Sequence, residues 1–132
     1  MRSVKDAALI CTAGAMLAAC AQGPTQRQEA DRRALAEARP VGEPIDCISL
    51  ASISHSRVRD DSTIDFYMRG GEVYRNTLPH QCPTLHLEDG FSYKTSLSRL
   101  CTVDVITVTS GSGVGGPSCA LGPFQRIETS VR

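Results

Sequence analysis

Four cysteines constrain the fold of this 132-residue chain more strongly than any other feature: Cys47, Cys82, Cys101 and Cys119. A chain of this length supports one small domain, whose core alone is marginally stable. In a small exported domain, an even number of cysteines indicates disulfides, each contributing roughly 2–4 kcal/mol. We therefore expect two disulfides. The spacing does not decide among the three possible pairings, and our preferred hypothesis joins Cys82 to Cys101 and Cys47 to Cys119.

The N-terminal segment has the pattern of an export signal. Met1–Lys5 is short and basic, and Ala7–Met16 is apolar but too short to span a bilayer. The Leu-Ala-Ala-Cys run that ends at Cys20 resembles the lipobox of bacterial lipoproteins, in which the cysteine thiol receives diacylglycerol. This resemblance implies that residues 1–19 are a lipoprotein signal peptide, removed by cleavage directly before a lipidated Cys20.

A lipid on Cys20 implies a membrane partner and a location. Two or more acyl chains anchor a protein stably, whereas one holds it weakly. In the lipoproteins that the segment resembles, an Asp after the cysteine favours inner-membrane retention, so Ala21 favours the inner leaflet of the outer membrane, facing the periplasm. The chain without residues 1–19 would keep 12 basic and 13 acidic side chains, and this balance argues against a nucleic-acid partner.

The composition predicts a tether followed by a folded domain. Residues 20–44 hold the lipidated cysteine and a stretch that is poor in large apolar side chains and punctuated by prolines, which is typical of a flexible linker. Its middle, Glu29–Arg39, is rich in Ala, Arg and Glu and is compatible with a loose helix. We expect the domain to span residues 45–128, with a tail at 129–132.

The clearest structural element is a β-hairpin. Residues 63–69 and 72–78 are β-rich and flank Gly70-Gly71, which suits a two-residue turn. This register places Tyr67 opposite Tyr74 and turns Ile64, Phe66, Met68 and Val73 inward. The other face then carries a polar, aromatic set whose residue types are enriched at interfaces: Tyr67, Arg69, Tyr74 and Asn76. We regard this set as a possible binding face for an envelope protein or a glycan.

Further short segments extend the β pattern. We expect a strand at 54–59 beside the hairpin, a second hairpin formed by 85–87 and 91–93, a helical turn at 96–101, and strands at 103–109 and 124–127. Residues 110–117 are expected to form a loop, although 111–116 fit G-x-G-x-x-G, because no helix follows to bind a pyrophosphate. The fold class is therefore all-β or β-rich, a small antiparallel barrel or sandwich with disulfides.

Signals for catalysis or metal binding are few. His80, Cys82, His86 and Cys101 would supply four zinc ligands, but the close cysteine pairs typical of zinc sites are missing, so we expect no metal and no other cofactor. Asp104 lies in an apolar segment and needs a partner if it is buried. The alternative function that these residues leave open is a metal-dependent or hydrolytic periplasmic enzyme using His80, His86 or Asp104.

Several short runs together resemble a known family. They are Cys-Ile at 47–48, Arg-Gly-Gly-x-Val-Tyr-Arg-Asn at 69–76, Leu-Pro at 78–79, Cys-Pro at 82–83, Leu-Cys-x-Val-Asp at 100–104 and Cys-Ala-Leu-Gly-x-Phe at 119–124. The chain from Cys47 to Phe124 is similar to a family of small bacterial lipoproteins, a domain of unknown function. The resemblance implies an exported domain held by disulfides, and no activity or catalytic residue. We therefore expect a lipid-anchored cell-envelope protein, a non-catalytic binding or structural module rather than an enzyme.

Overall fold

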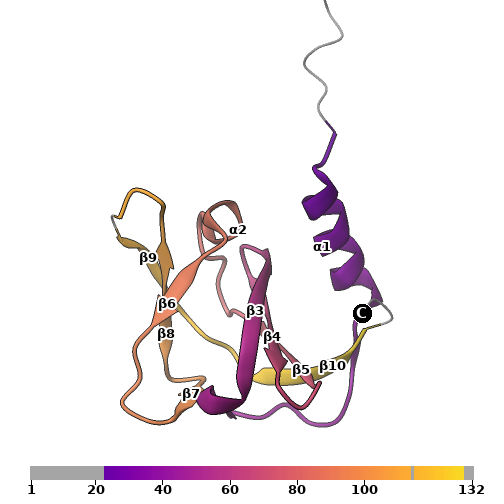
Figure 1. Cartoon of the computed structure of the whole chain (residues 1–132), viewed down its shortest axis with the longest axis vertical. Helices are drawn as coiled ribbons and strands as arrows, with labels where there is room; N and C mark the ends of the chain where they lie inside the picture. Colours follow the sequence, from indigo (N-terminus) through magenta and orange to yellow (C-terminus); the bar gives the residue numbers. More distant parts are fainter. Residues whose placement is uncertain (1–22, 114, 130–132) are drawn as a thin grey trace, which may run out of the picture.

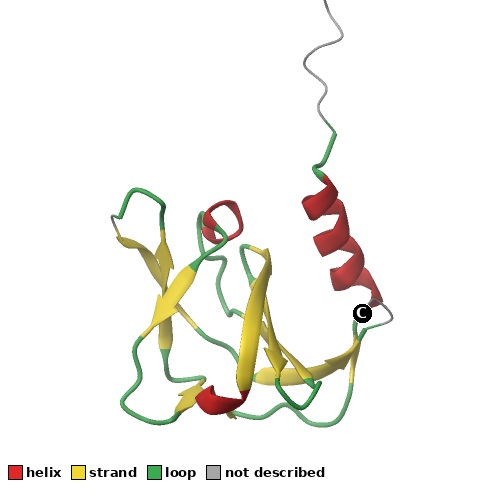
Figure 2. Ribbon diagram, viewed as in Figure 1, coloured by secondary structure: helices red, strands yellow, loops and turns green. Residues whose placement is uncertain are grey.

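The computed structural model describes residues 23–113 and 115–129. The expected signal peptide, the lipidation site Cys20 and the end of the expected tail lie outside these described residues. The described chain forms a strand-rich body with two short helices and a longer helix, α1, at its N-terminal side (Figures 1 and 2). Within the described ranges, no helix is long and apolar enough to cross a membrane.

The largest element is a five-stranded antiparallel sheet in the order β1-β10-β5-β4-β3. Its strands are β1 (Arg39–Pro40), β10 (Phe124–Glu128), β5 (Val73–Thr77), β4 (Thr63–Met68) and β3 (Ile53–Asp60). The three consecutive strands β3, β4 and β5 form the expected meander, and β10 adds beside β5 as the expected last strand. Figure 1 shows this sheet at the centre of the molecule, with α1 beside it.

Two smaller antiparallel sheets complete the β structure, so the expected β-rich antiparallel class is confirmed. One contains β6 (Phe91–Tyr93), β8 (Val105–Thr109) and β9 (Gly115–Ala120). The other pairs β2 (Cys47–Ser49) with β7 (Arg99–Cys101), and the 3-10 helix η1 (Leu50–Ser52) follows β2. The helical turn expected at 96–101 is wrong, because Arg99–Cys101 pairs with β2 as a strand.

The second hairpin, expected from 85–87 and 91–93, is also wrong. Residues Leu85–Glu88 form the one-turn helix α2, and β6 pairs with β8 instead. Leu85 is fully buried in the core while Leu87 is 80% exposed. The start of α2 is capped by a residue 25 positions earlier in the chain: the Asp61 carboxylate accepts a hydrogen bond from the His86 N–H at 2.8 Å. The alternating pattern of residues 85–87 carries no sign of this cap. Hydrophobic periodicity alone therefore could not distinguish a strand from a helical turn here.

The core lies between the inner face of the five-stranded sheet and the smaller sheets. Phe66 and Phe124 contact edge to face, with ring centroids 5.7 Å apart, and Phe91 from β6 packs against Phe66 in the same way at 6.1 Å. Ile106 and Val108 of β8 are completely buried against this group. Each large side chain of this kind contributes roughly 1.5–3 kcal/mol through removal of apolar surface from water.

The hairpin of β4 and β5 exists, but its expected register is wrong by one residue. Its loop has three residues, Arg69-Gly70-Gly71, because the Met68 N–H bonds to the Glu72 carbonyl at 2.8 Å. Gly71 adopts a φ of 95°, which the end of such a loop requires and glycine accepts without steric strain. Tyr67 therefore lies opposite Val73 rather than Tyr74.

This shift divides the expected binding face, because a one-residue slip turns every side chain of one strand to the other side of the sheet. Tyr74 and Asn76 share the inner face with Phe66; Tyr74 packs against the core and Asn76 is fully buried. The Asn76 amide bonds the backbone of Gly122 through both of its polar atoms. Arg69 is exposed in the turn, and Tyr67 alone remains on the outer face. The four residues therefore do not form one binding surface.

The segment expected to be a linker contains packed structure. Gln26–Glu37 forms α1, and Thr25 caps it through a reciprocal capping box with Gln28. Two of its residues, Asp31 and Ala34, are buried against the sheet. Strand β1 then pairs with β10. The packed part of the chain therefore begins at α1, before the expected boundary at residue 45.

Two disulfides are present, as expected, but the preferred pairing is wrong. Cys47 bonds Cys101, and these residues lie directly opposite each other on β2 and β7. Cys82, fully buried before α2, bonds Cys119 of β9. The pairing follows from which strands are neighbours, and chain order does not show this. Cys47 and Cys101 are 54 positions apart in the chain, yet β2 and β7 are adjacent in the sheet.

Candidate functional site

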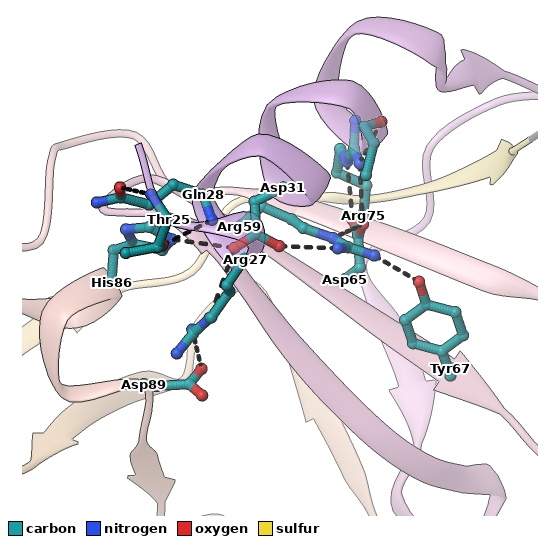
Figure 3. Close-up of polar contacts among 11 residues, drawn as sticks. Thr25, Arg27, Gln28, Asp31, Arg59, Asp65, Tyr67, Arg75, His86 and Asp89 are labelled. Carbon is teal, nitrogen blue, oxygen red and sulfur yellow. Dashed lines mark hydrogen bonds and ion pairs between the residues drawn. The ribbon is translucent and has the colours of Figure 1, made fainter. Parts of the chain in front are cut away.

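Four charged residues form a buried group between α1 and the outer face of the five-stranded sheet. We call Asp31, Arg59, Asp65 and Arg75 the ionic cluster, which Figure 3 shows with its neighbours. The exposed fraction is 1% for Asp31, 0% for Asp65 and 7% for Arg59. Charged residues are almost never this deeply buried unless they are paired. The ionic cluster is therefore the most unusual polar arrangement among the described residues.

Arg59, near the end of β3, binds three partners at once. Its Nη1 donates to Asp31 Oδ1 at 2.9 Å, its Nε to Asp65 Oδ2 at 2.9 Å, and its Nη2 to the Tyr67 hydroxyl at 2.6 Å. Burial alone would lower the pKa of Arg59, but the hydrogen bonds to Asp31 and Asp65 outweigh it, so the pKa lies above its usual value. On the alkaline side, the stability that the charged guanidinium contributes is lost only as pH rises from the unfolded-state pKa through that raised pKa. The guanidinium therefore stays charged throughout the physiological range.

Arg75 completes the cluster from the neighbouring strand β5. Its Nε lies 2.7 Å from Asp65 Oδ1 and its Nη2 lies 2.9 Å from Asp65 Oδ2, a bidentate pairing. The same Nη2 also donates to the Ala34 carbonyl of α1 at 3.3 Å. Asp65 thus accepts hydrogen bonds from two arginines, and Arg75 connects the sheet to the helix.

The second carboxylate oxygen of Asp31 faces the other side of the cluster. His86 Nε2 of α2 lies 3.1 Å from Asp31 Oδ2, and Arg27 Nε lies 3.6 Å from the same oxygen. Arg27 in turn reaches Asp89 at 2.6 Å, next to α2. These contacts join α1 to α2 as well as to the sheet.

The ionic cluster is suited to hold α1 in place. Its two carboxylates and two guanidiniums balance in charge, and every buried side-chain nitrogen and oxygen in the described part of the chain has a hydrogen-bond partner. Both carboxylates are held by guanidiniums, so these charges are used in contacts within the fold. The ionic cluster therefore connects α1 to the strands of the sheet.

An open pocket of about 970 Å³ lies next to the cluster, between α1 and the outer face of the sheet. Ligand sites typically have volumes of roughly 300–1,000 Å³ and are mainly apolar with a few polar groups. The pocket is lined by Ala30, Ala34, His55, Arg57, Arg59, Tyr67, Gly71, Glu72, Val73, Arg126, Ile127, Glu128 and Thr129. It thus fits the general description of a ligand site in both size and composition.

One row of cross-strand neighbours runs through the pocket. His55 pairs with Tyr67, Tyr67 with Val73, and Val73 with Ile127, which takes the row across β3, β4, β5 and β10. The His55 and Tyr67 rings stack in parallel, with centroids 4.5 Å apart and an interplanar angle of 6°. We call these four residues the pocket row. The row begins with the aromatic rings of His55 and Tyr67 and ends with the aliphatic side chains of Val73 and Ile127.

The residues named for a possible enzyme do not come together. His80 is exposed in the loop after β5, and His86 contacts Asp31 in the cluster. Asp104 accepts a hydrogen bond from the Cys101 N–H at 2.7 Å, which stabilises the turn between β7 and β8. In residues 23–113 and 115–129, no three His, Cys, Asp or Glu side chains are grouped as metal ligands.

Sequence reasoning missed the cluster and most of the pocket. Thr25 and Gln28 carry a capping-box signal that could have located the start of α1. The pairing of Asp31 with Arg59 has no comparable signal, because the two residues are 28 positions apart.

With this geometry established, comparison with known proteins gives one result. The chain belongs to a family of unknown function, DUF6491, whose model matches residues 3–129. No curated protein and no solved structure matches the chain. Any role for the domain must therefore be argued from its own residues.

Proposed function

We propose that this member of a family without an assigned function is a lipid-anchored protein of the cell envelope, and that its domain is a non-catalytic binding module. The observation that carries the binding role is the pocket of about 970 Å³ beside the saturated ionic cluster. The ionic cluster fixes α1 as one wall, and the sheet supplies the floor. A pocket formed by a helix and a sheet before the ligand binds avoids the loss of entropy that ordering a loop would require.

The anchor is supported by the N-terminal sequence. The family match begins at residue 3, so it includes the apolar segment and the lipobox-like run that ends at Cys20. The proposed location is the inner leaflet of the outer membrane, facing the periplasm, because Ala21 follows the cysteine.

The start of α1 limits how far the domain can lie from the membrane. Five residues separate Cys20 from Gln26, and a fully extended chain gains at most about 3.5 Å per residue, so the helix begins within roughly 20 Å of the lipid. A long flexible tether would have allowed a greater distance. The proposed module therefore works close to the membrane surface.

The enzyme alternative gains no support from the described residues. His86 and Asp104 bond to different parts of the fold, and His80 is exposed in the loop after β5. A hydrolytic or metal-dependent site needs such groups to converge on one cleft. The pocket contains none of the three.

Metabolic labelling with a fatty acid, followed by membrane fractionation, tests the anchor. We expect the wild-type chain to incorporate label and to sediment with membranes, and the Cys20→Ser variant to lose both properties. Cys11→Ser is the matched control, because it removes a cysteine from the same apolar segment but leaves the lipobox-like run intact. Equal labelling of wild-type and Cys20→Ser chains would refute the proposed anchor.

A further inference from the structure

We infer that the pocket beneath α1 binds a single-chain amphipathic anion: an apolar chain lies along the pocket row, and its acidic head group lies at the β3 end. The inference rests on the proposed binding role and specifies its ligand class. It is carried by an unpaired arginine at one end of the pocket, by the apolar row that leads away from it, and by the balance of charge around the rim.

The positively charged end is formed by Arg57 of β3, with His55 two residues before it on the same strand. Arg57 lies directly opposite Asp65, yet both oxygens of that carboxylate are already bound by Arg59 and Arg75. Arg57 is exposed and has no ion pair among residues 23–113 and 115–129. Its charge is therefore available to a ligand, and an exposed guanidinium at the edge of a pocket favours a carboxylate or phosphate.

The apolar part of the site follows the pocket row away from Arg57. Tyr67, Val73 and Ile127 succeed one another on neighbouring strands. Strands lie about 4.8 Å apart, so the three steps from His55 to Ile127 span roughly 14 Å. That length suits an extended chain better than a compact ring.

The wall opposite the row leaves room for this chain. Ala30 and Ala34 of α1 line the pocket, and they lie one helical turn apart on the same face of the helix. Their methyl groups are the smallest side chains that still present an apolar surface. A large residue at either position would fill the space between the helix and the sheet.

The distribution of charge favours one orientation of the ligand. On β10, the lining residues Arg126 and Glu128 balance in charge, and Glu72 lines the pocket just before β5, so the β5 and β10 side has no net positive charge. At the β3 end, the lining residues Arg57 and His55 have no acidic companion, because Asp65 is used by the ionic cluster. Charge complementarity therefore places an anionic head at β3 and directs the apolar chain toward β10.

Isothermal titration calorimetry with defined amphiphiles tests this inference. The protein is the full chain carrying Cys20→Ser, so that no attached lipid or solubilising detergent competes, and each amphiphile is kept below its micelle concentration. Dodecanoate and dodecyl phosphate should both bind. Dodecyltrimethylammonium has the same chain with a cationic head, and acetate has the head without the chain. Both should bind at least about tenfold more weakly. The ammonium head loses a charge-assisted contact that is typically worth a factor of this order, and acetate lacks the apolar chain that the pocket row would bury.

Two variants locate the site. Arg57→Gln should weaken dodecanoate binding by about tenfold and reduce its preference over the ammonium amphiphile, because a charge-assisted contact is lost. Ala30→Trp should abolish binding by filling the pocket. Ala30 is exposed, so we expect the variant to fold, and circular dichroism checks this. Arg99→Gln, an exposed arginine on β7 outside the pocket, is the matched control and should bind like the wild type.

The outcomes separate this inference from the proposed function. Equal binding of the anionic and cationic amphiphiles, or unchanged binding by the folded Ala30→Trp variant, would overturn the assigned ligand class or site. Absence of binding to every amphiphile would overturn the inference while leaving the lipid anchor and a binding role for other ligands intact. Failure of the proposed function would appear separately, as an unlabelled and soluble wild-type chain in the fractionation experiment.

Discussion

The Asp31 carboxylate accepts a hydrogen bond from Arg59 across 2.9 Å, although the two residues lie 28 positions apart in the chain. This contact joins α1 to the long strand β3. The helix buries only Asp31 and Ala34, so charge and hydrogen bonding, rather than a large apolar face, hold it on the sheet. A twelve-residue polar helix is barely stable alone in water, and its position depends on these contacts. The pocket wall therefore depends on the ionic cluster.

Replacing Arg59 by Met should strongly destabilise the protein. The substitution leaves Asp31 and Asp65 buried with one partner fewer, and breaking a buried ion pair from one side typically costs about 3–5 kcal/mol. Urea unfolding followed by circular dichroism measures the change in free energy. Arg57→Gln, on the same strand but exposed, should change it by less than about 0.5 kcal/mol. Similar losses for the two variants would contradict the structural role of the cluster.

Asp31→Asn tests whether the cluster holds α1 in particular. The amide keeps the size of the carboxylate but removes its charge, and it weakens hydrogen bonds that are worth about 1.5–3 kcal/mol when one partner is charged. Hydrogen exchange should become faster for the amides of α1, while β4 and β5 keep their protection. Uniform acceleration over the whole domain would show that the helix does not open separately.

The disulfide pairing predicts a specific peptide map. Proteolysis without reduction should yield one linked pair containing Cys47 and Cys101 and another containing Cys82 and Cys119. Replacing both Cys82 and Cys119 by Ala should destabilise the domain by about 2–4 kcal/mol. A peptide linking Cys82 to Cys101 would contradict the structure and agree instead with the pairing that we preferred from the sequence.

Gly122 should tolerate no side chain. A Cβ there would overlap the carbonyl oxygen of Thr77, and Gly122 is held in place by two hydrogen bonds with buried Asn76. Gly122→Ala should therefore destabilise the domain by about 1–3 kcal/mol or more, as overpacking usually does. Gly115→Ala is the matched control, since its Cβ would meet no atom within 4 Å. Thermal unfolding distinguishes the two, and equal melting temperatures would argue against the packing of β5 against this segment.

Local patterns predicted the meander of β3, β4 and β5, because β-rich runs and turn residues act over a few positions. They did not predict its register. Gly70-Gly71 is equally compatible with a two-residue turn and with the end of a three-residue loop, and the distinction depends on the hydrogen bond from Met68 to Glu72. The error of one residue moved Tyr74 and Asn76 from the inner face to the expected binding face. A polar residue such as Asn76 is buried only because the Gly122 backbone satisfies it.

The packing of α1 and the candidate site could not be predicted from the sequence, because both form through contacts between residues far apart in the chain. Residues 26–37 lack an apolar stripe, so hydrophobic periodicity gives no sign that α1 packs on a sheet. Its buried charged side chain is Asp31, whose partners Arg59 and His86 come from distant elements. The composition therefore predicted a linker for this segment, and it gave no indication of the pocket beneath α1.

The intact mass of the mature protein extracted from membranes tests the proposed anchor and the disulfide framework together. The account predicts a chain that begins at Cys20 and carries the mass of two or three acyl chains, with four thiols open to alkylation only after reduction. A species without lipid, or one that retains residues 1–19, would contradict the lipid anchor. Free thiols before reduction would contradict the two disulfides.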